Sequence, residues 1–287
     1  MDCANGKVFG LNFDLCGLCS ENDSADNKYL PEDVDNDKKV KAAKAYAAGF
    51  SFQNDGRLEE AVEKYQQCIR LDPIHPDAHY NMGNVLQLQQ NFEEACRYFN
   101  RTIELNPNHY LAHYNLGYIR HEQGDLNAAI SSFKTAADLN PNDADTWINL
   151  GLVYRDAENL QSSVWANRKA VAAAPRSEMA HYNLANTLHD LNQLREAIAA
   201  YERAVELDPR HVDAVFNLGV AYQENQNEEE ALRCYQAAYQ LDPSLEEAEK
   251  AIESLTEFLA LKKKNETAQG QAGSSDGKKK KKKGLFS

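Results

Sequence analysis

The feature that most constrains this chain is a fixed spacing between prolines. Between residues 73 and 243 a proline returns every 34 residues. The positions are Pro73, Pro107, Pro141, Pro175, Pro209 and Pro243. Because proline cannot continue a helix, it marks the same helix end in successive copies of one repeat. This period is typical of helix-turn-helix units that stack side by side and bury their apolar faces against one another.

Small and large side chains also recur at fixed positions inside these units. The first helix carries Gly49, Gly83, Gly117, Gly151 and Gly219, with Ala185 in the fifth unit. The second helix carries Ala61, Ala95, Ala129, Ala197 and Ala231, followed one turn later by Tyr65, Phe99, Phe133, Tyr201 and Tyr235. Small residues that face large ones predict antiparallel helix pairs, joined by polar turns such as residues 54–57.

At these residues the sequence resembles the tetratricopeptide repeat (TPR) family over about 42–245. The resemblance implies an all-α, right-handed α-solenoid of six 34-residue TPR repeats. A capping helix is expected at 246–261, where apolar residues such as Ile252 and Leu255 form one stripe. We expect residues 1–41 to be an acidic, largely disordered segment, and 262–287 to be a flexible linker followed by a polylysine tail.

The fourth repeat departs from this pattern. Ser163 and Asn167 occupy the positions where the other repeats have alanine and an aromatic residue, and Trp165 lies at an unusual position between them. The second helix of this repeat is therefore expected either to pack loosely or to expose Trp165 to a partner.

One asparagine recurs in each repeat from the second to the sixth. These residues, which we call the asparagine ladder, are Asn81, Asn115, Asn149, Asn183 and Asn217. Asparagine is a mediocre helix former, so its recurrence needs another reason. Its amide both donates and accepts hydrogen bonds, and a row of amides can hold the backbone of an extended peptide. Here the chain is similar to the repeats of O-GlcNAc transferase, where such a ladder holds substrate main chain.

The resemblance predicts that the ladder lines the concave face and binds an extended or disordered segment of a partner protein. The alternative is that these asparagines only tie neighbouring repeats together. The residues expected to flank the groove are Asn84, Asn186, Asp77, Asp145, Asp213, Glu122, Asp156, Asp190 and Glu224. An ordinary solvated acidic face is the alternative for the acids among them.

The charge distribution bears on the kind of partner. The formal net charge is −13, carried by an acidic body, whereas the tail ends in a lysine run at 278–283. An acidic body favours basic or neutral polar ligands. It argues against binding of nucleic-acid phosphates along the repeats. The lysine run has three interpretations: a nuclear-import signal, a contact with anionic membrane or nucleic acid, or a segment that folds back onto the acidic groove. The sequence indicates no particular oligomeric state.

No motif of an enzyme active site stands out, such as a glycine-rich phosphate loop or a nucleophile elbow. Cys16 and Cys19, with Cys3 upstream, match only half of a zinc site, because a closed site needs four ligands. The periodic histidines, such as His79 and His109, are expected to be helix-contact residues. We therefore predict no metal, no cofactor, no small-molecule substrate and no catalytic activity.

The predicted function is that of a non-catalytic scaffold or adaptor. The alternative is a substrate-recruiting or targeting subunit of an enzyme complex, such as a non-catalytic relative of the O-GlcNAc transferase repeat region. The N-terminus lacks the form of a signal peptide, and no apolar run is long enough for a membrane helix. These features predict a cytoplasmic protein, with the lysine run raising a nuclear location as an option.

Overall fold

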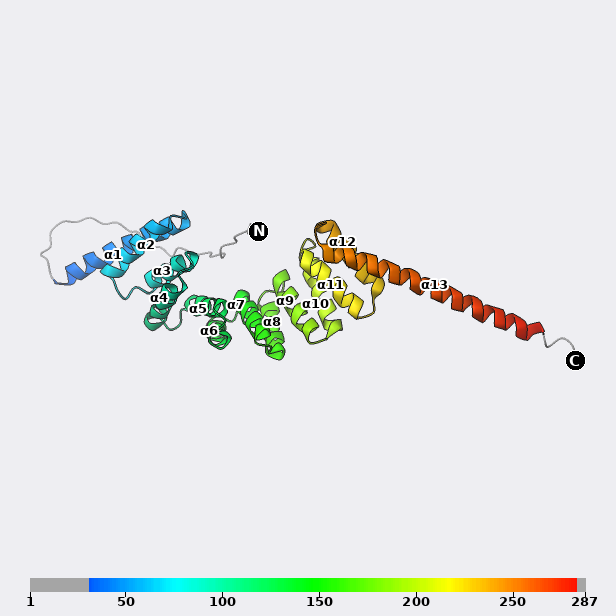
Figure 1. Ribbon diagram of the computed structural model, residues 1–287. Coiled ribbons are helices and arrows are strands. Elements are labelled where there is room, and N and C mark those ends of the chain that lie inside the picture. Colours follow the sequence, from blue (N-terminus) through cyan, green and yellow to red (C-terminus); the bar gives the residue numbers. More distant parts are fainter. Residues whose placement is uncertain (1–30, 283–287) are drawn as a thin grey trace.

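A computed structural model describes residues 31–282, with side chains from 36 to 265, and the described chain is built from helices. Their bounds are α1 (Pro31–Asn54), α2 (Leu58–Leu71), α3 (Pro76–Leu88), α4 (Phe92–Leu105), α5 (Tyr110–Glu122), α6 (Leu126–Leu139), α7 (Ala144–Asp156), α8 (Leu160–Ala173), α9 (Glu178–Asp190), α10 (Leu194–Leu207), α11 (Val212–Glu224), α12 (Glu228–Leu241) and α13 (Glu246–Lys282). Successive helices pair, and the pairs stack into an elongated solenoid (Figure 1). The predicted fold class is confirmed.

In four of the six repeats the two helices meet where a glycine faces an aromatic ring. A Cβ atom placed on Gly83 would lie 2.6 Å from the ring of Phe99, and one on Gly117 would lie 2.9 Å from the ring of Phe133. Both rings are fully buried. Because real Cβ atoms do not approach other atoms this closely, only glycine lets the two helices pack at this distance. The alternation of small and large residues in the sequence is therefore the contact that joins the two helices of a repeat.

The periodic histidines hold the junctions between repeats. A ring nitrogen of His75 accepts a hydrogen bond from the backbone N–H of Ala78, 3.2 Å away, and caps the start of α3. His79 places Nε2 3.0 Å from the carbonyl oxygen of Pro73. In the fourth repeat Trp147 takes the same position, and its indole N–H donates to the equivalent carbonyl oxygen at 2.8 Å. The prediction that these histidines are helix-contact residues agrees with these bonds.

The N-terminal boundary differs from the predicted one. α1 begins at Pro31, whereas the repeats were expected to start at 42, so residues 31–41 are helical rather than disordered. Proline is favoured in the first turn of a helix, where its missing N–H has no partner to lose. The predictions for residues 1–30, including Cys16 and Cys19, fall outside the described residues.

The C-terminal boundary differs as well. α13 continues to Lys282, past the predicted end of the capping helix at 261, so residues 262–277 are not a flexible linker. No proline interrupts this stretch, but Gly270, Gly273 and Gly277 are poor helix formers, so propensity alone does not account for the continuation. Figure 1 shows α13 leading away from the repeats, so the helix does not carry the lysine run back toward them.

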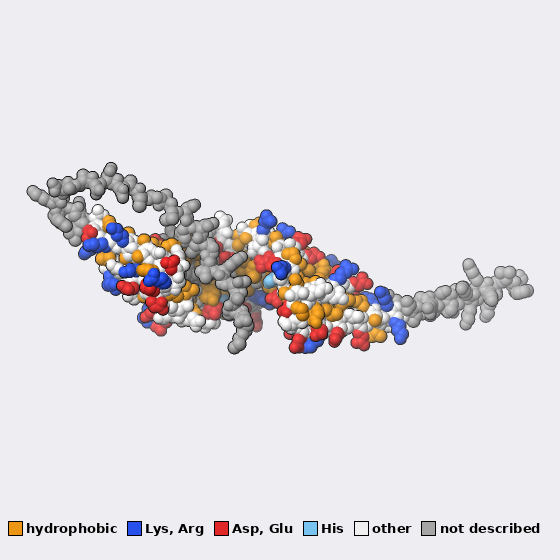
Figure 2. Space-filling model, turned by 90° about the horizontal axis from the view of Figure 1, so that it is seen from above, with side chains coloured by type: hydrophobic (Ala, Val, Ile, Leu, Met, Phe, Trp, Pro, Cys, Tyr) orange, Lys and Arg blue, Asp and Glu red, His pale blue; other side chains and the backbone are white. Residues whose placement is uncertain are grey.

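The surface of the described residues is mixed in character. In the view of Figure 2, acidic, basic and apolar side chains are interspersed over the repeats. None of the helices over residues 31–282 is both long enough and apolar enough to span a membrane.

Candidate functional site

The asparagine ladder lies on the first helices of the repeats, α3, α5, α7, α9 and α11. The first helices of neighbouring repeats contact one another: α1 contacts α3, α5 contacts α7, and α7 contacts α9. Because the first helices come closest together, they form the inner layer of the solenoid. We call the side of this layer that carries the ladder asparagines the ladder face.

The ladder amides are tied to the preceding repeat. In four of the five ladder residues, Nδ2 donates a hydrogen bond to the hydroxyl oxygen of a tyrosine 35 positions earlier. The pairs are Asn81 with Tyr46 (3.0 Å), Asn115 with Tyr80 (3.5 Å), Asn149 with Tyr114 (2.9 Å) and Asn217 with Tyr182 (3.1 Å). Asn115 also donates to the side-chain oxygen of Asn84 at 2.7 Å. The amide nitrogens therefore tie neighbouring repeats, which was the alternative raised for this row.

The tie is missing at the junction of the fourth and fifth repeats. Ile148 occupies the tyrosine position there, and Nδ2 of Asn183 instead donates to the carbonyl oxygen of Met179 in its own helix, at 2.9 Å. Asn183 is nevertheless buried. This junction thus lacks a hydrogen bond that four other junctions share.

The amide oxygens are in a different situation from the nitrogens. Those of Asn149, Asn183 and Asn217 accept none of the hydrogen bonds formed among the described residues. Because the nitrogen bonds fix the orientation of the amides, the oxygens are held in place as available acceptors.

A row of side-chain pairs between basic and acidic residues runs beside the ladder. Each pair joins a basic residue to the flank acid of the next repeat. The pairs are His121 with Asp156 (2.6 Å), Arg155 with Asp190 (2.5 Å) and His189 with Glu224 (2.9 Å). The sequence analysis named these acids but missed the role of Arg155. The sequence did contain a signal for these pairs. Residues 121, 155 and 189 are 34 apart, and they directly precede the flank acids Glu122, Asp156 and Asp190.

Other predicted flank acids have no basic partner of this kind. Glu122, Asp145 and Asp213 are exposed, and none of them forms an ion pair within the described part of the chain. Burial, together with the nearby Asp143, raises the pKa of Asp145. Asp77 lies 4.0 Å from the ring of His109. The carboxylates of Glu122, Asp145 and Asp213 are therefore not neutralised by a cation of the described residues.

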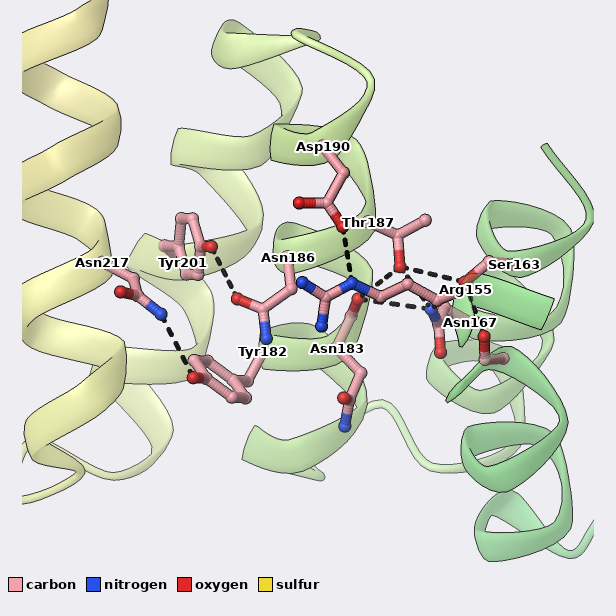
Figure 3. A network of polar contacts seen from close by, with 11 residues as sticks. Arg155, Ser163, Asn167, Tyr182, Asn183, Asn186, Thr187, Asp190, Tyr201 and Asn217 are labelled. Carbon is pink, nitrogen blue, oxygen red and sulfur yellow. Dashed lines mark hydrogen bonds and ion pairs between the residues drawn. The ribbon is translucent and has the colours of Figure 1, made fainter. Parts of the chain in front are cut away.

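Three predicted residues converge on a pocket of the ladder face, between α7, α9 and α11. Its volume is about 200 Å³. It is lined by Arg155, Asn186, His189, Asp190, Tyr201, Asn217 and Val220. The hydroxyl of Tyr201 donates to the side-chain oxygen of Asn186 at 2.6 Å, as Figure 3 shows. We call this the Arg155 pocket.

The fourth repeat is tightly packed, so the expectation of loose packing is wrong. Ser163 and Asn167 are fully buried, and Oγ of Ser163 donates to the carbonyl oxygen of Gly151 at 2.7 Å. Nδ2 of Asn167 contacts the Thr187 hydroxyl oxygen at 3.1 Å (Figure 3). Trp165 is 47% exposed and meets Trp147 edge-on, so its expected exposure is confirmed, whereas its contact with a partner stays a prediction.

Among the described residues, no group of three or more His, Cys, Asp or Glu side chains lies close enough together to hold a metal ion.

Burial raises the pKa of the Cys68 and Cys234 thiols to about 11, so both are protonated at neutral pH.

Comparison with known families defines the class of protein. Tetratricopeptide repeat models match residues 76–109, 98–131 and 182–246, and a TPR repeat model matches 54–90 and 117–156. The chain is an α-solenoid repeat protein. It belongs to the tetratricopeptide repeat family.

Solved structures show the same fold. YrrB, described as a TPR protein with an unusual peptide-binding site, is 24% identical; the match covers 66% of this chain and 98% of that one, with a TM-score of 0.59. MamA is 23% identical over 56% of this chain and 95% of its own, with a TM-score of 0.54. PilF of Pseudomonas aeruginosa is 16% identical over 75% of this chain and 97% of its own, with a TM-score of 0.64. No curated protein sequence gives a match.

Proposed function

We propose that this protein is a non-catalytic scaffold that binds an extended segment of a partner protein along the ladder face. The observation that carries the proposal is the set of fixed amide oxygens on Asn149, Asn183 and Asn217, which accept no hydrogen bond from the described residues. The backbone N–H groups of an extended peptide are the donors that such a row suits. The peptide-binding site named for YrrB shows that a protein of this fold can take a peptide.

Besides joining neighbouring repeats, the hydrogen bonds between the ladder amides and the tyrosines fix the orientation of the amides. Each tie holds Nδ2 against a tyrosine of the preceding repeat, so the ligand does not have to order the amide when it binds. One such hydrogen bond contributes only about 0.5–1.5 kcal/mol, so affinity requires several ladder residues at once. A ladder that contacts only main chain holds a segment without selecting its sequence.

The charge of the ladder face narrows the class of partner. Glu122, Asp145 and Asp213 are exposed carboxylates without ion pairs among the described residues. An acidic peptide would be repelled by them, whereas lysine or arginine side chains would be attracted. The proposed partner segment is therefore basic or neutral and polar, and lacks a run of acidic residues.

The test is a pull-down with the full chain and two matched variants. The first variant is Asn115→Ala/Asn149→Ala/Asn183→Ala, which removes three ladder amides. The control is Tyr80→Phe/Tyr114→Phe, which removes two of the same internal ties but keeps the asparagines. We expect the asparagine variant to lose its partners, and the tyrosine variant, which keeps the amides but no longer holds two of them, to retain its partners with weaker binding.

Two other results would change the conclusion. If the asparagine variant keeps all partners, the ladder is not the binding site. If a catalytic polypeptide is captured together with its substrate, the chain is the recruiting subunit of an enzyme complex, which was the alternative function.

A further inference from the structure

The Arg155 pocket offers donors and an acceptor beside each other on the ladder face. Arg155 uses Nε to bind Oδ2 of Asp190, at 2.5 Å. Among the described residues, its two terminal nitrogens have no hydrogen-bond partner, and neither does the second carboxylate oxygen of Asp190. In Figure 3 these atoms point toward the same side, where Asn186 and Tyr201 lie.

Asn186 adds a further donor in a fixed orientation. Its side-chain oxygen accepts the hydroxyl proton of Tyr201 at 2.6 Å, so its NH₂ group remains available. Burial raises the pKa of Tyr201, so this hydroxyl keeps its proton. The pocket therefore presents N–H donors from Arg155 and Asn186 beside a carboxylate acceptor from Asp190.

Charge and size limit what can enter. The hydrogen bond with Asp190 raises the pKa of Arg155, so the guanidinium stays charged, and its ion pair with Asp190 balances that charge. The pair is only 38% and 30% exposed. The pocket volume of about 200 Å³ lies below the range of about 300–1,000 Å³ usual for small-molecule sites. It suits a single side chain of a peptide that lies on the ladder.

We propose that the Arg155 pocket binds a glutamine or asparagine side chain of the partner segment. The carbonyl oxygen of that side chain accepts hydrogen bonds from Arg155 and Asn186, and its NH₂ group donates to Asp190. A carboxamide carries both functions on adjacent atoms and has no net charge, as the ion pair requires. This inference rests on the proposed function, and it adds sequence selectivity that the ladder alone does not have.

Side chains of similar shape but different charge fit poorly. Glutamate would place an anionic oxygen against Asp190, and lysine would place an ammonium group against Arg155. Leucine would leave the hydrogen-bonding groups of the pocket without partners. The pocket thus rejects each competitor through a different atom, which is the usual basis of specificity.

The probe is a synthetic peptide library applied to the full chain. Its background positions hold mixtures of serine, threonine, glycine and lysine, and one central position is fixed as Gln, Asn, Glu, Lys or Leu. We expect peptides with Gln or Asn to be retained about tenfold better than those with Glu, Lys or Leu, as one charge-assisted hydrogen bond provides.

Single variants then change the preference in a predictable direction. Asp190→Asn leaves the charge of Arg155 uncompensated and should shift the preference to Glu. Arg155→Gln leaves the charge of Asp190 uncompensated and should shift it to Lys. The matched control is Glu196→Gln, which removes the acid of another ion pair between the fourth and fifth repeats, with Arg168 on the second helices α8 and α10, and should leave the Gln preference unchanged.

The possible results distinguish a failure of this inference from a failure of the proposed function. If wild type binds the peptides but shows no preference, or prefers Glu or Lys, the pocket assignment is wrong and the ladder proposal stands. An Asp190→Asn variant that is folded and still prefers Gln over Glu also overturns the assignment. If no peptide binds wild type, both proposals are wrong.

Discussion

Asn167 packs its side chain against Gly151, where the second and third repeats put a phenylalanine ring against the glycine. A Cβ atom on Gly151 would lie 2.8 Å from Cγ of Asn167. The side-chain oxygen of Asn167 is buried and accepts no hydrogen bond, while the nitrogen contacts Thr187 and the carbonyl oxygen of Asn183. An unsatisfied buried acceptor costs about 1–3 kcal/mol, so the fourth repeat is less stable than its neighbours at this point.

Asn167→Phe should therefore stabilise the protein. The ring replaces the unsatisfied oxygen, and Thr187 keeps its contacts with Ser163 and with the Asn183 carbonyl oxygen. We expect the free energy of unfolding to rise by about 1 kcal/mol, measured by urea denaturation. The reverse change in the third repeat, Phe133→Asn, should lower it by about 3–5 kcal/mol. A destabilised Asn167→Phe variant would show that the amide contacts outweigh the cost of the buried oxygen.

Gly83→Ala should destabilise the second repeat. The added methyl group would meet three carbons of the Phe99 ring at 2.6, 2.8 and 3.0 Å, and the buried ring has little room to move. Overpacking of this kind costs about 1–3 kcal/mol. Asn127→Ala, on the exposed side of α6, is the control and should not lower the urea midpoint. Equal midpoints for the two variants would contradict the close approach of α3 and α4.

Tyr114→Phe should weaken the junction between the third and fourth repeats. The change removes the hydroxyl that accepts from Nδ2 of Asn149 at 2.9 Å, and it keeps the ring against Phe133. We expect a loss of about 0.5–1.5 kcal/mol in the free energy of unfolding. Tyr118→Phe, at an exposed ring of the same helix, should change it much less. Similar losses from both variants would mean that the tie does not contribute to stability.

Binding of a lysine-containing peptide should weaken as salt is added. Exposed carboxylates such as Glu122 and Asp213 interact through solvent, and salt shortens the range of that interaction to about 10 Å at 0.1 M. Glu122→Gln/Asp213→Asn should lower the affinity by about 0.2–1 kcal/mol per charge and reduce the salt dependence, as measured by calorimetry. Asp138→Asn, on the second helix α6, should leave both unchanged. A salt-independent affinity would exclude the acidic flank as a binding determinant.

Stability should fall on mild acidification. Burial lowers the pKa of His79 and His109 in the folded state. The unfolded chain, with a histidine pKa of about 6.5, then binds protons that the folded chain does not. The stability is therefore fully present above about pH 6.5 and is lost as the pH falls toward the lower folded value. His79→Gln, which keeps an N–H donor but cannot titrate, should flatten the dependence of the urea midpoint on pH between about 5 and 7. An unchanged slope would show that other groups control it.

The sequence was most informative where a residue type recurs with the period of the repeat. The proline spacing predicted the repeats, and the positions of Gly83 and Phe99 predicted their contact, because both depend on local helix geometry and on volume. The departures at Ser163 and Asn167 were also visible, but their packing was misjudged. A buried polar residue can be held by hydrogen bonds from another repeat, and the sequence does not show which atoms meet.

The ends of the array were harder to predict. α1 begins at Pro31 and α13 continues to Lys282, in segments whose polar composition suggested disorder and a linker. Composition measures how much apolar surface a segment can bury, whereas a helix already formed in a packed repeat can continue without burying more, because each added residue gains a backbone hydrogen bond.

The sequence by itself determined that this chain is a solenoid of TPR units with one asparagine at the same position in each unit from the second to the sixth, because the period fixes which residues are equivalent. Only the tertiary structure decided what that asparagine does. Its nitrogen bonds a tyrosine 35 residues earlier, and Arg155 pairs with Asp190 across a junction. Bonds between repeats depend on how far one unit is rotated and shifted against the next. That geometry arises from the packing of whole helices, so the period shows which residues are equivalent but not which atoms of neighbouring repeats meet.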